Sequence, residues 1–100
     1  MVVGVFQFEL HLPESRSLKD KRRLVKSVLT RLKAAYNICA TEIDYHDLRQ
    51  RATIGVACIS TSDYQAQELF SCIQRDIEMK DGLEITDKNI MTHKIDLDGD

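Results

Sequence analysis

The chain has 100 residues, of which 43% are hydrophobic and 30% are charged, and its formal net charge at pH 7 is −2. This length and composition predict one domain with its own core and exclude a disordered or collagen-like chain. No apolar run approaches the roughly 18 residues of a membrane span, and no signal-peptide pattern is present, so a cytoplasmic protein is expected. We expect the domain to cover residues 1–97, with residues 98–100 as a frayed acidic tail.

The first half of the chain predicts a strand followed by a helix. Apolar and polar residues alternate over residues 2–12, which is typical of a strand with one buried face. A helix is expected to begin after Ser17, which forms the S-x-x-D variant of a capping box with Asp20, and to end near Tyr36. Its apolar stripe consists of Leu18, Val25, Val28, Leu29, Leu32 and Tyr36.

The second half predicts a hairpin, a helix and a last strand. Residues 38–45 and 52–60 are the expected hairpin strands, and a second helix is expected from Asp63 to Lys80, before the Asp81-Gly82 stop signal. The last strand lies within residues 83–97, with its register open. The order βαββαβ predicts an α+β fold of the ferredoxin-like class, a two-layer sandwich of an antiparallel four-stranded sheet with two helices on one face.

The other face of this sheet would carry no helix, and we call it the open face. Its side chains are small and fairly apolar: Val3, Val5, Gln7, Gly55, Ala57 and Ile59. Uncovered apolar surface of this kind is typical of protein interfaces. One hypothesis is therefore a protein–protein interaction module that forms a homodimer or binds another protein through the open face.

The first helix carries most of the positive charge. From Glu14 to Tyr36 there are eight Lys or Arg and two acids, whereas residues 61–100 contain ten acids and four bases. Like charges four residues apart and cations near a helix N-terminus both disfavour the helix. An anionic partner such as RNA would explain the cations; a merely solvated face, or pairing with the acidic second half, is the alternative. Five cations fall in one sector, the basic row: Lys19, Arg22, Arg23, Lys26 and Lys33.

Three further cations are candidates for the same surface. Lys21 lies in line with the apolar stripe, so its ammonium either snorkels to water, which is the favoured interpretation, or reaches a specific acceptor. Arg49 and Arg51 lie in the predicted hairpin turn and would extend the basic surface. We include all three among the candidate nucleic-acid-binding residues.

No residue pattern indicates catalysis, a metal site or a cofactor, so a protein that is not an enzyme is expected. The histidines are scattered, and no acid recurs around them at ligand spacing. The odd number of cysteines predicts small buried side chains in a reducing compartment rather than disulfides. The strand RATIGVACI also lacks the aromatic residues with which an RNA-recognition motif stacks bases.

The segments SRSLKDKRRLVKS (residues 15–27) and NICATEIDYHDLRQRATIGVACIS (residues 37–60) resemble the YlxP-like family of small bacterial proteins of unknown function. The resemblance covers most of the chain, to about Met79. It implies a ferredoxin-like fold and a link to ribosome maturation or translation, with ribosomal RNA or ribosomal subunits as partners. The family usually has a tryptophan before the Gln-Arg pair, where this chain has Arg49, so a stacking contact there is not expected to carry over.

Overall fold

A computed structural model of the chain describes residues 1–45 and 47–96. Its element order confirms the predicted βαββαβ arrangement, with one π-helical turn added after the second helix. The predicted tail, residues 98–100, lies outside the described residues, as do residues 46 and 97. The elements are β1 (Val2–His11), α1 (Leu18–Ala35), β2 (Cys39–Asp44), β3 (Arg51–Ser60), α2 (Asp63–Asp76), η1 (Ile77–Asp81) and β4 (Glu84–Lys94).

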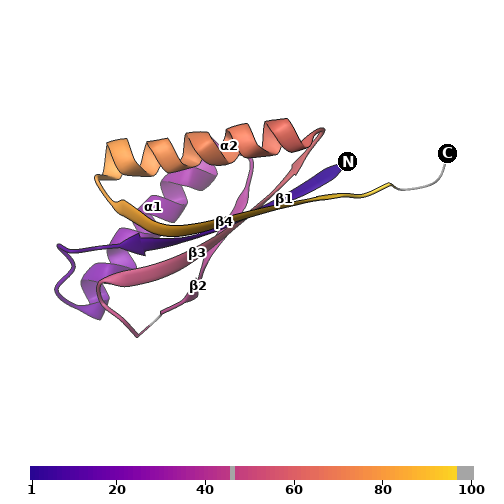
Figure 1. Cartoon of the computed structure of the whole chain (residues 1–100). Helices are drawn as coiled ribbons and strands as arrows, with labels where there is room; N and C mark the ends of the chain where they lie inside the picture. Colours follow the sequence, from indigo (N-terminus) through magenta and orange to yellow (C-terminus); the bar gives the residue numbers. More distant parts are fainter. Residues whose placement is uncertain (46, 97–100) are drawn as a thin grey trace.

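The four strands form one antiparallel sheet in the order β2-β3-β1-β4. Phe6 on β1 lies opposite Val56 on β3 and opposite Ile90 on β4. Both helices pack on the same face of the sheet, and none of the described residues forms a helix on the other face (Figure 1). This is the predicted two-layer ferredoxin-like sandwich.

The core lies between the sheet and the two helices. Even-numbered β1 residues face the helices, and Phe6 and Phe8 are almost fully buried there. The Phe6 ring stacks on Phe70 of α2 at a centroid distance of 5.1 Å. Gly4 lets α2 approach closely, because a β-carbon at that position would lie 3.1 Å from Ala66 and from the Phe70 ring.

The start of α1 follows from its capping residues. Ser17 has extended backbone geometry, and its hydroxyl accepts a hydrogen bond from the Asp20 amide, as a helix N-cap does. The Asp20 carboxylate accepts from the Arg16 amide, one residue before the position that a capping box uses. The helix ends at Ala35 because Tyr36 returns to extended geometry.

The structure fixes the register of β4, which the sequence left open. After α2 the chain makes the π-helical turn η1 and then reverses at Gly82, whose φ of 64° lies in the left-handed region. The pairing of β4 with β1 shifts between Glu9 and Leu10, so the strand begins with a bulge and is regular afterwards. No helix within the described ranges has the length and apolarity needed to cross a membrane.

Candidate functional site: a basic helix and an open sheet face

All five residues of the basic row are exposed on the outer surface of α1. Only Arg23 forms an ion pair with a described residue, at 3.0 Å from Asp20, and its side chain is still 74% exposed. Lys19, Arg22, Lys26 and Lys33 have no such pair among residues 1–45 and 47–96. The row is therefore accessible to a partner.

The basic row faces away from α2. Arg22 and Arg31 are two and a half turns apart, so their side chains leave opposite sides of the helix. Arg31 extends to α2 and η1, where it pairs with Asp76 and Asp81. The side of α1 that carries Arg22 therefore lies on the flank of the molecule, away from α2. On this flank α1 packs above β2, which it contacts.

Lys21 does not belong to this surface. Its side chain is 1% exposed, its Nζ lies 2.7 Å from Glu42 Oε2, and it donates a hydrogen bond to the Tyr45 carbonyl. The predictions that Lys21 snorkels to water and joins the nucleic-acid-binding residues are therefore wrong, because the end of β2 supplies two buried acceptors. Lys21 and Glu42 are close enough to form an ion pair, but their contact does not have hydrogen-bond geometry, because Glu42 Oε2 has no hydrogen-bond partner among the described residues.

The two residues of the Gln-Arg pair position the hairpin. The Gln50 amide donates hydrogen bonds to the carbonyls of Pro13 and Ser15, which connects the hairpin to the loop before α1. Arg51 lies on the open face, where its guanidinium donates two hydrogen bonds to the Glu9 carboxylate. Arg51 therefore does not extend the basic row as expected, because it lies on the other side of the sheet and is paired. Arg49 is exposed in the hairpin connection.

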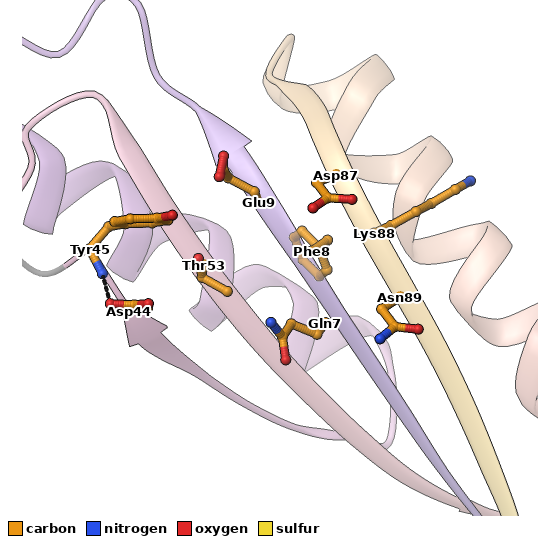
Figure 2. A pocket seen from close by; sticks show the side chains of 9 residues that line it. All are labelled: Gln7, Phe8, Glu9, Asp44, Tyr45, Thr53, Asp87, Lys88 and Asn89. Atoms are coloured by element: carbon orange, nitrogen blue, oxygen red, sulfur yellow. Dashed lines mark hydrogen bonds between the residues drawn. The ribbon is translucent and has the colours of Figure 1, made fainter.

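One end of the open face is covered by the chain itself. Tyr45 has a left-handed φ of 62° and lies under the Arg51 guanidinium, 4.3 Å from the ring centroid. Beneath them Thr53 is only 7% exposed. Figure 2 shows Tyr45, Thr53 and Glu9 around a polar hollow of about 150 Å³, with Gln7 at its edge. The expectation that the open face is uncovered is thus wrong at this end.

The Glu9–Arg51 pair shapes the electrostatics of this polar hollow. The hydrogen bond from Arg51 lowers the pKa of Glu9, and the same contact raises the pKa of Arg51. Thr86 adds a hydrogen bond to Glu9 at 3.3 Å. The pair therefore stays ionised over the physiological range and holds the hairpin against β1.

The rest of the open face is apolar and shallowly hollowed. Two adjacent hollows of about 400 and 390 Å³ share Cys39 and Ala57. All six predicted interface residues are brought together along these two hollows, and Gln7 also borders the polar hollow. The sequence-based interpretation did not include Ile43, which lies at the β2 bulge over Gly55 and is 45% exposed. The six predicted residues are Val3, Val5, Gln7, Gly55, Ala57 and Ile59.

A polar cluster between α1 and α2 has no signal in the sequence, because the residues that it joins across the two helices lie 40 or more positions apart. Arg31 pairs with Asp76, and the Tyr36 hydroxyl donates a hydrogen bond to the same carboxylate at 2.9 Å. Burial opposes ionisation of Asp76, but the bonds from Arg31 and Tyr36 outweigh it and lower its pKa. Burial, then the bond to Asp76, raises the pKa of Tyr36. The cluster joins the two helices.

The cysteines divide between core and surface. Cys58 is buried as expected, and burial raises the pKa of its thiol, which disfavours the nucleophilic thiolate. The expectation is wrong for Cys39 and Cys72, which are exposed. Within the described ranges, no three His, Cys, Asp or Glu side chains are grouped as a metal ion would require.

The chain is similar to a known family, to a bacterial protein and to a solved structure. Residues 3–90 match the family described as protein of unknown function DUF503. The chain is 34% identical over 67 residues to the uncharacterized protein YlxP of Bacillus subtilis (strain 168), which covers 67% of this chain and 73% of that protein. It is similar in fold to the solution structure of the de novo designed protein LFR1 1 with ferredoxin fold, with a TM-score of 0.55, 15% identity and coverage of 100% and 96%.

These matches bear on fold and family. The designed protein has under a quarter of its residues in common with this chain, so its similarity supports the ferredoxin-like fold alone. The family match extends over most of the chain and contains α1, the hairpin and most of β4. The chain therefore belongs to the DUF503 family of proteins of unknown function, the YlxP-like family that the residues of α1 and the hairpin had indicated.

Proposed function

We propose that this protein binds structured RNA, such as ribosomal RNA, through the basic row on α1. One observation carries the proposal: five exposed cations share one sector of α1, and four of them form no ion pair with a described residue. Neighbouring like charges on a helix, and cations near its N-terminus, are each unfavourable by a few tenths of a kcal/mol or more. Selection for stability would not produce this row, whereas phosphate oxygens would match it.

The geometry of the row suits a phosphate backbone. Lys19 and Lys33 are 14 residues apart, which corresponds to about 21 Å along a helix with a rise of 1.5 Å per residue. That length can follow several phosphates on one RNA strand. Helical RNA is recognised mainly by its shape and its backbone rather than by base edges, so a row of cations without aromatic residues is suitable for it.

The alternative that α1 pairs with the acidic half of the chain has less support. The acids of α2 and η1 that reach α1 are Asp76 and Asp81, and both pair with Arg31 on the other side of the helix. They leave the basic row without an acidic neighbour from α2. A merely solvated face, in contrast, predicts no RNA binding.

The test is a charge reversal with a matched control. We expect Arg22→Glu/Lys26→Glu to lower the affinity for a ribosomal RNA hairpin at least tenfold in fluorescence anisotropy at 100 mM salt. The control, Arg75→Glu/Lys94→Glu, introduces the same charge at two exposed cations away from the row, and should stay within threefold of the wild type. Equal losses in both variants, or wild-type binding in both, would contradict the proposal.

The open face favours a second candidate function, a protein–protein interaction module. The observation behind it is the pair of apolar hollows, together with Val5 at 42% and Ile59 at 72% exposure. The acids Glu9, Asp44 and Asp87 around the neighbouring polar hollow suit a polypeptide that places apolar side chains beside a basic one. The variant Val5→Lys separates the two functions, because it changes the open face and not the basic row. Its affinity for RNA should equal that of the wild type, and a tenfold loss would indicate that RNA binds on the sheet.

A further inference from the structure

The outer edge of β4 is a third surface accessible to a partner, distinct from the open face and the basic row. β4 is the last strand of the sheet and is 11 residues long, with β1 paired along one side and no strand among the described residues on the other (Figure 1). An edge of this kind offers a row of N–H and C=O groups to another strand. Ile90 at 40% and Met91 at 65% exposure add apolar surface near its middle.

The usual devices that protect an edge strand are weak here. The strand contains no proline, and its bulge lies at the beginning, opposite Glu9 and Leu10. An edge lysine can repel an incoming strand, but Lys88 is turned toward α2, where its Nζ donates a hydrogen bond to Gln74 Oε1 at 2.8 Å. From residue 87 to residue 93 the edge is regular and accessible.

We propose that β4 pairs antiparallel with β4 of a second copy of this chain, so that two sheets join into one of eight strands. A two-fold axis perpendicular to the sheet keeps each side chain on its own face, so only residues of the same parity can lie opposite one another. With the axis at Ile90, Asp87 lies opposite the partner's His93, Asn89 opposite the partner's Met91, and Ile90 opposite the partner's Ile90.

Charge and shape select this register over its neighbours. Moving the axis to Met91 places Asp87 opposite the partner's Ile95 and His93 opposite the partner's Asn89, so both Asp–His pairs are lost. Moving it to Asn89 places Met91 opposite the partner's Asp87 and Ile90 opposite the partner's Lys88. Only the register centred on Ile90 forms two Asp–His pairs and one apolar pair in a single seven-residue ladder.

The position of Ile90 supports the same arrangement. Ile90 lies opposite Phe6, so its side chain is on the helix side of the sheet, yet it is 40% exposed because α2 leaves the outer part of β4 uncovered. In the joined sheet the two Ile90 side chains would cover each other between the two α2 helices. A ladder of this length buries less than a standard protein interface, so the dimer should be concentration-dependent.

Sedimentation equilibrium of the full chain between 10 μM and 1 mM tests the pairing. We expect dimers at the upper end for the wild type, and at least a tenfold weaker association for Ile90→Lys, which places two cations at the axis. Leu48→Lys, in the hairpin connection at 42% exposure, is the matched control and should dimerise normally. A wild type that stays monomeric at 1 mM, or a dimer that Ile90→Lys leaves intact, would overturn the proposal.

A charge exchange tests the register and does not depend on the tolerance of Ile90 to substitution. Asp87→Lys should weaken the dimer because it faces the partner's His93, and His93→Glu should weaken it because it faces the partner's Asp87. The double variant Asp87→Lys/His93→Glu restores an opposite-charge pair at both positions and should recover association. Failure of the double variant to recover, with a wild-type circular dichroism spectrum, would reject this register. RNA binding through α1 can fail or succeed independently of either result.

Discussion

At the scale of single residues, the buried cation of α1 is the most consequential departure from the sequence-based expectation. Helical spacing places Lys21 in the apolar stripe, but spacing along one helix cannot reveal acceptors that arrive from another element. Glu42 and the Tyr45 carbonyl come from the end of β2, more than 20 residues away. The structure thus separates one lysine that holds the fold together from the cations beside it.

Lys21→Met should destabilise the protein strongly. The substitution leaves the Glu42 carboxylate, 15% exposed, and the Tyr45 carbonyl without their partner. Removing one member of a buried ion pair typically lowers the free energy of unfolding by about 3–5 kcal/mol. Urea unfolding of Lys21→Met, and of Lys21→Met/Glu42→Leu, measures the effect, and the double variant should recover much of the loss. A loss below about 1 kcal/mol in the single variant would mean that the pair is not sequestered from water.

Asp76 should contribute to stability at neutral pH and cease to do so in acid. Its pKa in the folded protein lies below the ordinary value, so its contribution is complete above that ordinary value and is lost as the pH falls through the folded-state pKa. Asp76→Asn should therefore lower the free energy of unfolding by about 2 kcal/mol at pH 7, the range for hydrogen bonds to a charged group.

The pH profile distinguishes this role from simple packing. The difference between Asp76→Asn and the wild type should shrink as the pH is lowered from 5 to 2, since the wild-type carboxyl then becomes neutral too. Urea unfolding across this range is the measurement. A difference that stays constant with pH would assign the loss to packing rather than to the ionised pair with Arg31.

At the scale of elements, the segments that indicated the family meet at one end of the molecule. Ser17 caps α1, Lys21 binds the end of β2, and Gln50 bonds the loop before α1. Attachment of the hairpin to α1 thus explains many of the residues that indicated the family, in the segment SRSLKDKRR and in the Gln-Arg pair. The part that this attachment does not explain is the exposed basic row.

The cations of α1 should therefore lower the stability of the protein while they increase its affinity for RNA. Lys19 lies in the first turn, where the helix dipole disfavours a cation by about 0.3–1 kcal/mol, and it is four residues from Arg23. Lys19→Glu should raise the free energy of unfolding by up to about 1 kcal/mol while weakening RNA binding. Thermal unfolding and anisotropy on the same samples test both halves. A variant that loses stability and affinity together would indicate that Lys19 has a structural role.

The helices and strands were predicted correctly where a single local sequence pattern determines the secondary structure. Alternation in β1 and β3 and the apolar stripe of α1 suffice to predict the sandwich, because each buries one face against another element. Local pattern does not fix features that depend on distant residues. Tyr45 covers Thr53 through a left-handed backbone and a contact with Arg51, and the β4 register depends on its pairing with β1.

At the scale of the whole molecule, charge is separated in space as it is in sequence. The basic row lies on the flank of α1 that faces away from α2, and the acidic residues belong mainly to α2 and the segments after it. A formal net charge of −2 means that the field of the whole protein does not attract RNA. Binding must then depend on the local contacts of the basic row, in one orientation of the molecule.

This separation predicts a defined salt dependence. Each phosphate that a cation neutralises contributes about 0.7–0.9 to the magnitude of the slope of log affinity against log salt concentration, so four to five contacts give a slope of about −3 to −4.5. Arg22→Glu/Lys26→Glu should reduce the magnitude of the slope by about 2, and Arg75→Glu/Lys94→Glu should leave it unchanged. Anisotropy titrations from 50 to 300 mM salt measure it. A slope near zero in the wild type would mean that any RNA contact is not made by phosphates, and would exclude the basic row as the binding surface.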